Sequence, residues 1–349
     1  MKISLIFIIV ITLCIFCENN EIINPVEEEK GYVAFIGRFD FSDINQPVFM
    51  HSGNAIRARF SGTSVTLKLE DEKLTNFFNV IIDNKQFVIR ANRSDNTYVL
   101  AENLKNTVHT VEIFRRTEWH GGNSTFLGFE FNEGAKLLAP VIKDKKIEFI
   151  GDSYLCGFCN EISGPDEEFS YETENAYMTF GAISSRALNS EYISICYSGI
   201  GIVIGHNDST FIISNYYDLL SNHSPVTWDY THYQPNLVVI AMGSNDVSVG
   251  VDSLKFVDSY VNFLGRIRNN YSNVPIVCLA GPYSLNQNWR TFRNYVKASV
   301  EVFAKTDDKV YYFHFTPVIF DGCEDHPVVV EHQQLANELV PFIKQLMNW

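Results

Sequence analysis

Basic side chains are in short supply in this chain. Its 349 residues include 27 Lys and Arg against 41 Asp and Glu, which gives a formal net charge of -14 and an isoelectric point near 5.1. A broad acidic balance disfavours a nucleic-acid-binding protein, and it also disfavours a protein held at a membrane surface by a polybasic segment. We therefore expect neither nucleic acid nor a charged membrane surface as a partner.

Cysteine is also scarce. The chain has seven cysteines, five of which follow residue 17. So few cysteines exclude a small scaffold held together by disulfides, and an odd number leaves at least one thiol unpaired within the chain. Cys156 and Cys159 form a C-x-x-C pair, but no second pair and no histidines at ligand spacing accompany it. The sequence therefore predicts no metal site and no cofactor.

Long hydrophobic runs are missing except at the amino terminus. Residues 3–16 are apolar apart from one serine and one threonine, follow Lys2, and give way to polar and acidic residues from Glu18. This run is shorter than the ~20 residues that a membrane-spanning helix needs, but it suits the hydrophobic segment of a secretion signal. We therefore expect a cleaved signal over residues 1–17, a secreted protein and no stable membrane anchor. A buried N-terminal strand is the alternative.

Apolar residues as a whole are plentiful, at 46% of the chain with 14% aromatic, which excludes a disordered or collagen-like protein. The length favours two domains at about 150 residues each. After a polar linker over residues 18–30, residues 31–139 contain short strands with alternating apolar side chains, as in AIRARF and VTLKLE, and a hairpin turning at Asp83-Asn84. Seven to nine such strands predict an antiparallel β-sandwich of jelly-roll type.

Residues 140–349 follow a different rhythm. Five apolar strands, KKIEFI, EYISICY, LVVIAMG, VPIVCLAG and KVYYFHF, alternate with segments of helical periodicity, including those at about 253–270, 289–305 and 328–348. This order predicts a flavodoxin-like α/β domain with a five-stranded parallel sheet between helices. Active sites in such domains lie beyond the carboxyl ends of the strands.

The predicted strand ends carry a distinct set of residues. They are Gly151-Asp152-Ser153 after the first strand, Ser198-Gly199-Ile200-Gly201 after the second, Gly243-Ser244-Asn245-Asp246 after the third, and Asp321 to Pro327 after the fifth. Each segment alone has an ordinary structural explanation as a turn, a cap or a loop. Together they place a serine, glycines, an asparagine and a histidine on one rim, which is the inventory of acyl transfer.

These blocks resemble those of the SGNH/GDSL hydrolases, and more closely those of the two-domain glycan deacetylases of carbohydrate esterase family two. The segments GDSYLCGFCNE, TWDYTHYQPNLVVIAMGSND and GCEDHP carry the resemblance in the second domain, and GRFDFSD and AIRARFSGTSVTLKLED carry it in the first. The resemblance covers nearly the whole chain after the signal. It implies a carbohydrate O-acetyl esterase that works through an acyl-enzyme on an acetylated polysaccharide or glycan.

The resemblance also implies the role of each residue. Ser153 attacks the ester carbonyl, and His326 takes its proton and later delivers it to the sugar oxygen. The oxyanion is held by the N–H of Ser153, the N–H of Gly199 and the side-chain amide of Asn245. Gly201 is the alternative to Gly199 as the glycine donor.

The histidine block departs from the family pattern Gly-Cys-Asp-Trp-His-Pro. Here Glu324 stands in the place of the acid, and Asp325 replaces a tryptophan that could stack on a sugar. We expect Glu324 to orient His326, because it lies two residues away on the same side of an extended loop. Asp321 is the second choice, and Asp325 is disfavoured because adjacent side chains point apart. The alternative is a dyad in which a main-chain carbonyl holds the imidazole.

The cysteines and asparagines allow two further predictions. Cys156 lies three residues after Ser153 and Cys323 three before His326, so we expect a disulfide between them, with two buried free thiols as the alternative. N-glycosylation sequons occur at Asn92, Asn123, Asn207, Asn222 and Asn270.

Two other functions stay open. A GDSL-type lipase or lysophospholipase shares the catalytic rim, although it has no need of a β-sandwich, and a glycan-binding protein could retain the rim without activity. The sequence leaves the acetylated glycan and the oligomeric state undetermined.

Overall fold

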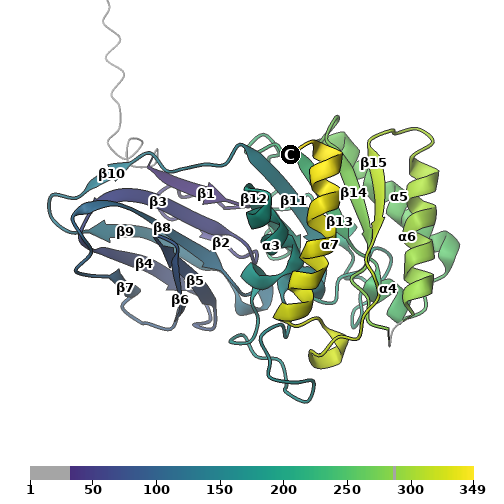
Figure 1. Ribbon diagram of the computed structural model, residues 1–349, viewed down its shortest axis with the longest axis horizontal. Helices are drawn as coiled ribbons and strands as arrows, with labels where there is room; N and C mark the ends of the chain where they lie inside the picture. Colours follow the sequence, from purple (N-terminus) through teal and green to yellow (C-terminus); the bar gives the residue numbers. More distant parts are fainter. Residues whose placement is uncertain (1–31, 286–287) are drawn as a thin grey trace, which may run out of the picture.

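The computed structural model describes residues 32–285 and 288–349, which form two layered domains side by side (Figure 1). The expected signal over residues 1–17 and the expected linker over residues 18–30 lie outside the described residues. The front domain, up to residue 139, consists mainly of antiparallel strands, whereas the back domain alternates parallel strands with helices. The predicted fold class is therefore confirmed: a β-sandwich followed by an α/β domain.

Two antiparallel sheets enclose the core of the front domain. One has the order β1-β3-β8-β5-β6, with β10 also paired to β3, and the other has the order β2-β9-β4-β7. The bounds are β1 (Val33–Ile36), β2 (Val48–Phe49), β3 (Ala55–Gly62), β4 (Val65–Asp71), β5 (Phe77–Ile82), β6 (Lys85–Arg90), β7 (Thr97–Ala101), β8 (Thr107–Arg115), β9 (Ser124–Phe131) and β10 (Lys136–Leu138). These are ten strands among the described residues rather than seven to nine, because β2 and β10 are too short to show a pattern.

The alternation predicted for the front domain is present in β3 and β4. Ile56, Ala58 and Phe60 of β3 are buried, and every second residue of β4 from Val65 is buried against them. The predicted hairpin joins β5 to β6, and its two central residues, Asp83 and Asn84, have φ of 48° and 69°. Positive φ at both positions is typical of a type I′ turn, whose twist matches that of the strands.

A parallel sheet of order β12-β11-β13-β14-β15 forms the centre of the back domain. Its strands are β11 (Lys145–Gly151), β12 (Ser190–Cys196), β13 (Leu237–Ala241), β14 (Ile276–Ala280) and β15 (Val310–His314), and the helices are α2 (Ser153–Cys156), α3 (Phe180–Ala187), α4 (Ser244–Ser248), α5 (Ser253–Asn270), α6 (Trp289–Phe303) and α7 (Val329–Met347). α3 and α7 pack on one face, and α5 and α6 pack on the other (Figure 1). The central strands β13 and β14 are consequently buried along their whole length. Four short 3₁₀ turns complete the described elements: η1 (Trp119–Gly121), η2 (Ala176–Met178), η3 (Ile213–Asn215) and η4 (Cys323–Asp325).

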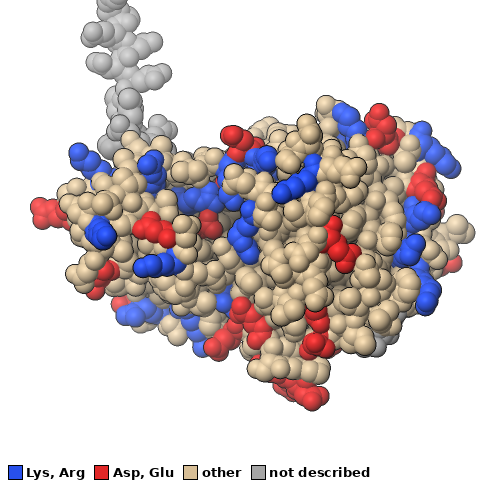
Figure 2. Space-filling view, viewed as in Figure 1, with Lys and Arg blue, Asp and Glu red and all other residues tan. Residues whose placement is uncertain are grey.

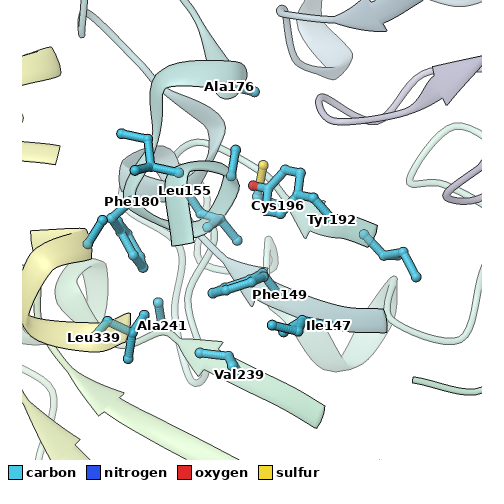
Figure 3. Packing of buried hydrophobic residues seen from close by; sticks show 14 of the residues in the cluster. Ile147, Phe149, Leu155, Ala176, Phe180, Tyr192, Cys196, Val239, Ala241 and Leu339 are labelled. Atoms are coloured by element: carbon cyan, nitrogen blue, oxygen red, sulfur yellow. The ribbon is translucent and has the colours of Figure 1, made fainter. Parts of the chain in front are cut away.

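The core beneath α2 fixes the start of that short helix. Figure 3 shows Leu155 of α2 packed among side chains from the sheet and the covering helices, including Phe149 and Phe180. All three side chains are fully buried. Burying a side chain such as leucine contributes about 1.5–3 kcal/mol. A four-residue helix that has little stability of its own is thus held in place by packing.

A buried arginine joins the two domains. Arg38 of the front domain donates from Nη1 to the carbonyl oxygens of Tyr217 (2.5 Å) and Leu219 (2.6 Å) in the back domain. Its guanidinium also lies 5.3–5.5 Å from the ring centres of Tyr217, Trp228 and Tyr230. Carbonyl oxygens and aromatic faces stabilise a cation that would otherwise be costly to bury. This contact holds the front domain against the edge of the back domain.

Candidate active site

The carboxyl ends of β11, β12 and β13 lie at one edge of the parallel sheet, and a pocket of about 720 Å³ opens there. Ser153 follows β11, Gly199 follows β12 and Asn245 follows β13, and all three line the pocket. His326 reaches the same pocket from the loop between β15 and α7. The structure therefore brings together the residues that the strand-end rule selects.

Ser153 and His326 are in hydrogen-bond contact. Ser153 Oγ lies 2.8 Å from Nε2 of His326. Ser153 is the first residue of α2, and the carboxylate of Asp152 caps this helix by accepting from the N–H of Tyr154 at 3.2 Å. Asp152 also accepts from Ser244 Oγ at 2.5 Å, and burial raises the pKa of Asp152 to about 7. Asp152 thus orders the turn at Ser153 and connects it to the segment after β13.

Main-chain carbonyls orient the imidazole of His326. Its Nδ1 lies 3.0 Å from the carbonyl oxygen of Cys323 and 3.1 Å from that of Glu324. Nδ1 must carry the proton to donate to a carbonyl, so Nε2 is left to accept from Ser153. The turn has positive φ at Glu324 (51°) and Asp325 (56°), a local conformation in which the chain is not extended.

This geometry corrects the expectation that the carboxylate of Glu324 holds His326. The expectation assumed an extended loop, but the chain turns through η4, and Glu324 contacts the ring through its carbonyl oxygen instead. The N–H of Asp321 donates to Glu331 Oε1 at 3.0 Å. Glu331, at the start of α7, also accepts from the N–H of Val328 at 2.7 Å and so closes the loop around His326.

The environment of His326 favours its neutral form. Burial lowers the pKa of His326 below its ordinary value, and this effect is partly offset by the Cys323 carbonyl and by the nearby Glu324. A neutral imidazole with its proton on Nδ1 is the form that can act as a general base toward Ser153.

The oxyanion donors predicted from the family pattern all line the pocket. Gly199 has φ of 80°, and a side chain there would find open space, with only His206 within 4 Å. Gly201 is turned away: its N–H donates to the carbonyl of Phe211 at 3.2 Å. Asn245 donates from Nδ2 to Ile200 O at 2.8 Å, and an amide nitrogen carries a second hydrogen. The geometry favours Gly199 over Gly201 as the glycine donor.

Asp246 is a site residue that the sequence analysis did not select. Its carboxylate accepts from the N–H groups of Ile202 (2.9 Å), Val203 (2.7 Å) and Ile204 (3.0 Å). One buried carboxylate thus accepts three hydrogen bonds, which fix the loop that follows Gly199. The available signal was its position directly after Asn245, at a strand end where a buried carboxylate needs backbone donors.

The predicted disulfide between Cys156 and Cys323 is wrong. Cys156 is bonded to Cys196 at the end of β12, and Cys159 is bonded to Cys323, with Cα separations of 5.7 and 5.9 Å. The reason is the turn after α2. Gly157 has φ of 88° there, and the chain changes direction between Cys156 and Cys159. A disulfide does connect the nucleophile and histidine loops, but through Cys159. Among the cysteines of residues 32–285 and 288–349, the one that stays unpaired is buried Cys278.

The front domain forms one wall of the pocket, through residues that the sequence analysis did not select. Trp119 and His120, in the η1 turn after β8, line the pocket with their rings 3.8 Å apart. The back domain adds six further aromatic side chains to the lining, namely Tyr154, Phe158, Phe211, Tyr283, Trp289 and Phe292. No local pattern in the β-sandwich sequence distinguishes the η1 turn from other loops.

The sequons differ in accessibility. Asn92 and Asn207 are exposed, and Asn123, Asn222 and Asn270 are partly buried. Asn270 donates from Nδ2, the atom that carries a glycan, to Asp218 at 3.0 Å. Asn207 lines the pocket, where a glycan would restrict entry. Glycosylation stays a prediction. Asn92 is the sequon best suited to carry a glycan, because it is exposed and does not line the pocket.

The surface carries charges of both signs. Figure 2 shows Lys and Arg side chains interspersed with Asp and Glu side chains and with large neutral areas on that face. Within residues 32–285 and 288–349, no helix has the length and apolar character to cross a bilayer. Nor do three His, Cys, Asp or Glu side chains of the described chain meet in a group suited to a metal ion.

Known families match both halves of the chain. The model of the carbohydrate esterase 2 N-terminal domain matches residues 35–140, and that of the GDSL-like lipases and acylhydrolases matches residues 147–339. With a serine–histidine pair at the strand ends, the back domain is a GDSL-like hydrolase domain. The chain as a whole belongs to carbohydrate esterase family two.

Individual relatives agree with this assignment. The solved family two carbohydrate esterase from Clostridium thermocellum, in complex with cellohexaose, is 34% identical with a TM-score of 0.85, over 91% of this chain and 99% of that one. An acetylxylan esterase / glucomannan deacetylase from Cellvibrio japonicus is 25% identical over 95% of both chains. The cellulase/esterase CelE of Acetivibrio thermocellus is 36% identical over 93% of this chain, which spans only 40% of the length of CelE.

Proposed function

We propose that this protein is a secreted esterase that removes O-acetyl groups from a polysaccharide or glycan. The observation that carries the proposal is the 2.8 Å contact between Ser153 Oγ and Nε2 of His326, whose other nitrogen faces main-chain carbonyls. Relatives named as acetylxylan esterases support the substrate class. Two disulfides are typical of an oxidising compartment and support secretion.

The proposed reaction has two halves. His326 Nε2 takes the proton of Ser153 as Oγ attacks the acetyl carbonyl, and the negative oxygen is received by the N–H of Ser153, the N–H of Gly199 and the amide of Asn245. The ester C–O bond then breaks, and protonated His326 delivers its proton to the departing sugar oxygen. In the second half, His326 takes a proton from a water molecule, which attacks the acetyl-enzyme. The bond between the acetyl carbon and Ser153 Oγ breaks, acetate leaves, and His326 returns the proton to Ser153.

The pocket also bears on the carbohydrate. Aromatic faces such as those of Trp119 and Trp289 suit contact with the apolar face of a sugar ring. Asp325 lines the pocket at the position where the family pattern has tryptophan. A carboxylate there replaces one stacking surface, so we expect weaker docking of a cellulose-like chain than a tryptophan would provide.

The test is acetate release from a panel of acetylated oligosaccharides and polysaccharides, run beside p-nitrophenyl esters of acetate and of a long-chain acid. We expect acetate release and preference for the short ester. Ser153→Ala should lower kcat by about 10⁴-fold or more, while Ser248→Ala, a serine lining the same pocket, should keep the activity.

Three results would contradict the proposal. Turnover unchanged in Ser153→Ala would remove the assigned nucleophile. Preference for the long-chain ester would favour a lipase, and glycan binding without any hydrolysis would favour a binding protein.

A further inference from the structure

A carboxylate of the front domain contacts the loop that carries Gly199. Glu118 lies between the end of β8 and η1 and is only 1% exposed. Its Oε2 accepts from the N–H of Ser198 at 2.7 Å. Hydrogen bonds from a backbone N–H to a carboxylate are short and about twice as strong as those between neutral groups. The residue next to the proposed oxyanion donor is therefore held by the other domain.

Gly199 is fixed from both sides. Before it, Ser198 donates to Glu118, and after it, the carbonyl oxygen of Gly199 accepts from the N–H of His206 at 2.8 Å. Gly199 has φ of 80°, and glycine has more conformational freedom than any other residue, so its orientation depends on contacts that hold it. With these two anchors, the direction of the Gly199 N–H is set before a substrate arrives, which is what an oxyanion donor requires.

The loop that carries Glu118 is itself held by a buried arginine. Arg115 donates from Nη2 to the carbonyl oxygens of Glu118 (3.2 Å) and Gly122 (2.6 Å), and from Nε to that of Thr117 (2.9 Å). Burial lowers the pKa of Arg115 to about 10, which leaves it a cation at neutral pH. The position of Glu118 is thus determined by the core of the front domain.

The surroundings of Glu118 are compatible with a buried carboxylate. Glu174 of the back domain is fully buried nearby, and its burial, together with Glu118, raises the pKa of Glu174 well above the ordinary value. The raised pKa favours the neutral form of Glu174 beside the carboxylate of Glu118. His120 Nδ1 lies 3.7 Å from Oε1 of Glu118 on the other side.

From these contacts we infer that Glu118 is a positioning residue of the front domain that holds the Gly199 peptide in its oxyanion-binding orientation. The inference rests on the proposed esterase function and assigns the β-sandwich a part in the chemistry. It predicts that the place of the acceptor oxygen, more than the charge of residue 118, decides kcat.

The decisive comparison is between Glu118→Gln and Glu118→Asp. Glutamine keeps an acceptor oxygen at the same distance from the backbone but loses the charge, and aspartate keeps the charge but withdraws the acceptor by one methylene. We expect kcat for p-nitrophenyl acetate to fall less than threefold in Glu118→Gln and about tenfold or more in Glu118→Asp, with KM within twofold in both. The opposite order, or equal kcat values, would overturn the inference.

Glu174→Gln is the matched control, because it changes the same buried pair of carboxyl groups without removing the bond to Ser198. Its kcat should stay within threefold of the unchanged protein. A loss in this variant as large as that of Glu118→Asp would show that disturbance of the buried cluster, and not the acceptor position, lowers activity, and would also overturn the inference.

Ser153→Ala distinguishes a failure of the proposed esterase function from a failure of the role assigned to Glu118. If this variant still hydrolyses p-nitrophenyl acetate at the normal rate, the proposed function fails whatever Glu118 does. If it is inactive while Glu118→Asp matches the unchanged protein, the esterase assignment stands and only the role of Glu118 is lost.

Discussion

The two domains contribute to the pocket in different ways. The back domain provides the proposed reacting groups, Ser153 and His326, and the proposed oxyanion donor Asn245, each from a segment that follows a parallel strand. The front domain provides one turn after an antiparallel strand, with Trp119 as a wall and Glu118 as a contact to the oxyanion loop. A parallel sheet gathers its strand ends at one edge, whereas a sandwich loop reaches a site only through docking.

This difference predicts that substitutions in the two domains change different kinetic constants. Changes on the strand-end rim of the back domain should lower kcat, because these groups act on the transition state. Changes in the wall provided by the front domain should alter substrate binding, with Glu118 as the proposed exception. The following variants are ordered from the largest expected effect to the smallest.

Among the variants compared below, Asn245→Ala should lower kcat the most. Loss of one oxyanion donor typically lowers kcat by about 10²–10³-fold, with little change in KM, because the bond strengthens in the transition state. Steady-state kinetics on p-nitrophenyl acetate measures this, and Asn207→Ala, an exposed residue of the same pocket, is the control. A loss below about fivefold would make Asn245 a structural residue that only holds Ile200.

Replacing Cys159 and Cys323 together by serine should loosen the loop that carries His326. We expect the free energy of unfolding to fall by about 2–5 kcal/mol and kcat to fall about tenfold at a temperature where the protein stays folded. Urea unfolding and kinetics measure the two effects, with Cys278→Ala as a control outside both disulfides. An unchanged kcat would mean that this disulfide stabilises the fold without positioning the base.

The pH dependence should reflect the neutral form of His326. Because burial lowers its pKa, the base is active above that pKa and is lost as pH falls through it. We expect kcat/KM to rise with pH and reach its plateau with a midpoint below the ordinary value of about 6.5, at about tenfold per pH unit on the acid side.

Asp152→Asn is the control for this profile, because burial raises the pKa of Asp152 to about 7, which lies within the pH range that the profile covers. The acid limb should keep its midpoint in this variant. A midpoint above 6.5 in both proteins would contradict a base kept neutral by burial.

Trp119→Ala should test the front wall. Loss of one aromatic contact, at about 0.5–1.5 kcal/mol, predicts that KM for an acetylated oligosaccharide rises about 2–12-fold with kcat unchanged. KM for p-nitrophenyl acetate, which has no sugar, serves as the control and should not move. Equal effects on both substrates would mean that Trp119 shapes the catalytic rim rather than the sugar-binding wall.

Glu324→Gln should have the smallest effect. The main-chain carbonyl of Glu324 faces His326 and is retained in this variant, so we expect kcat to fall less than about threefold. Asp321→Asn and Asp325→Asn provide the comparison. A loss in Glu324→Gln far above that of the other two would restore the carboxylate of Glu324 as the orienting acid.

Much of the rim could be predicted from the sequence, for a local reason. Gly199 and Asn245 follow apolar strands, and a strand end is visible in the chain itself as the point where the apolar pattern stops. The Asp83-Asn84 turn could also be predicted from the sequence, since two neighbouring residues determine it. The fold class, the order of the elements and the identities of the rim residues were in this sense contained in the sequence.

Other features were decided only by tertiary structure. Cys159 pairs with Cys323 across 164 residues, and Ser198 donates to Glu118 across 80 residues. The imidazole of His326 is held by carbonyl oxygens, which every residue possesses and which no side-chain pattern marks. A sequence indicates which residue types can react, but their distances and directions depend on how separate segments pack, because each contact needs both partners in place at once.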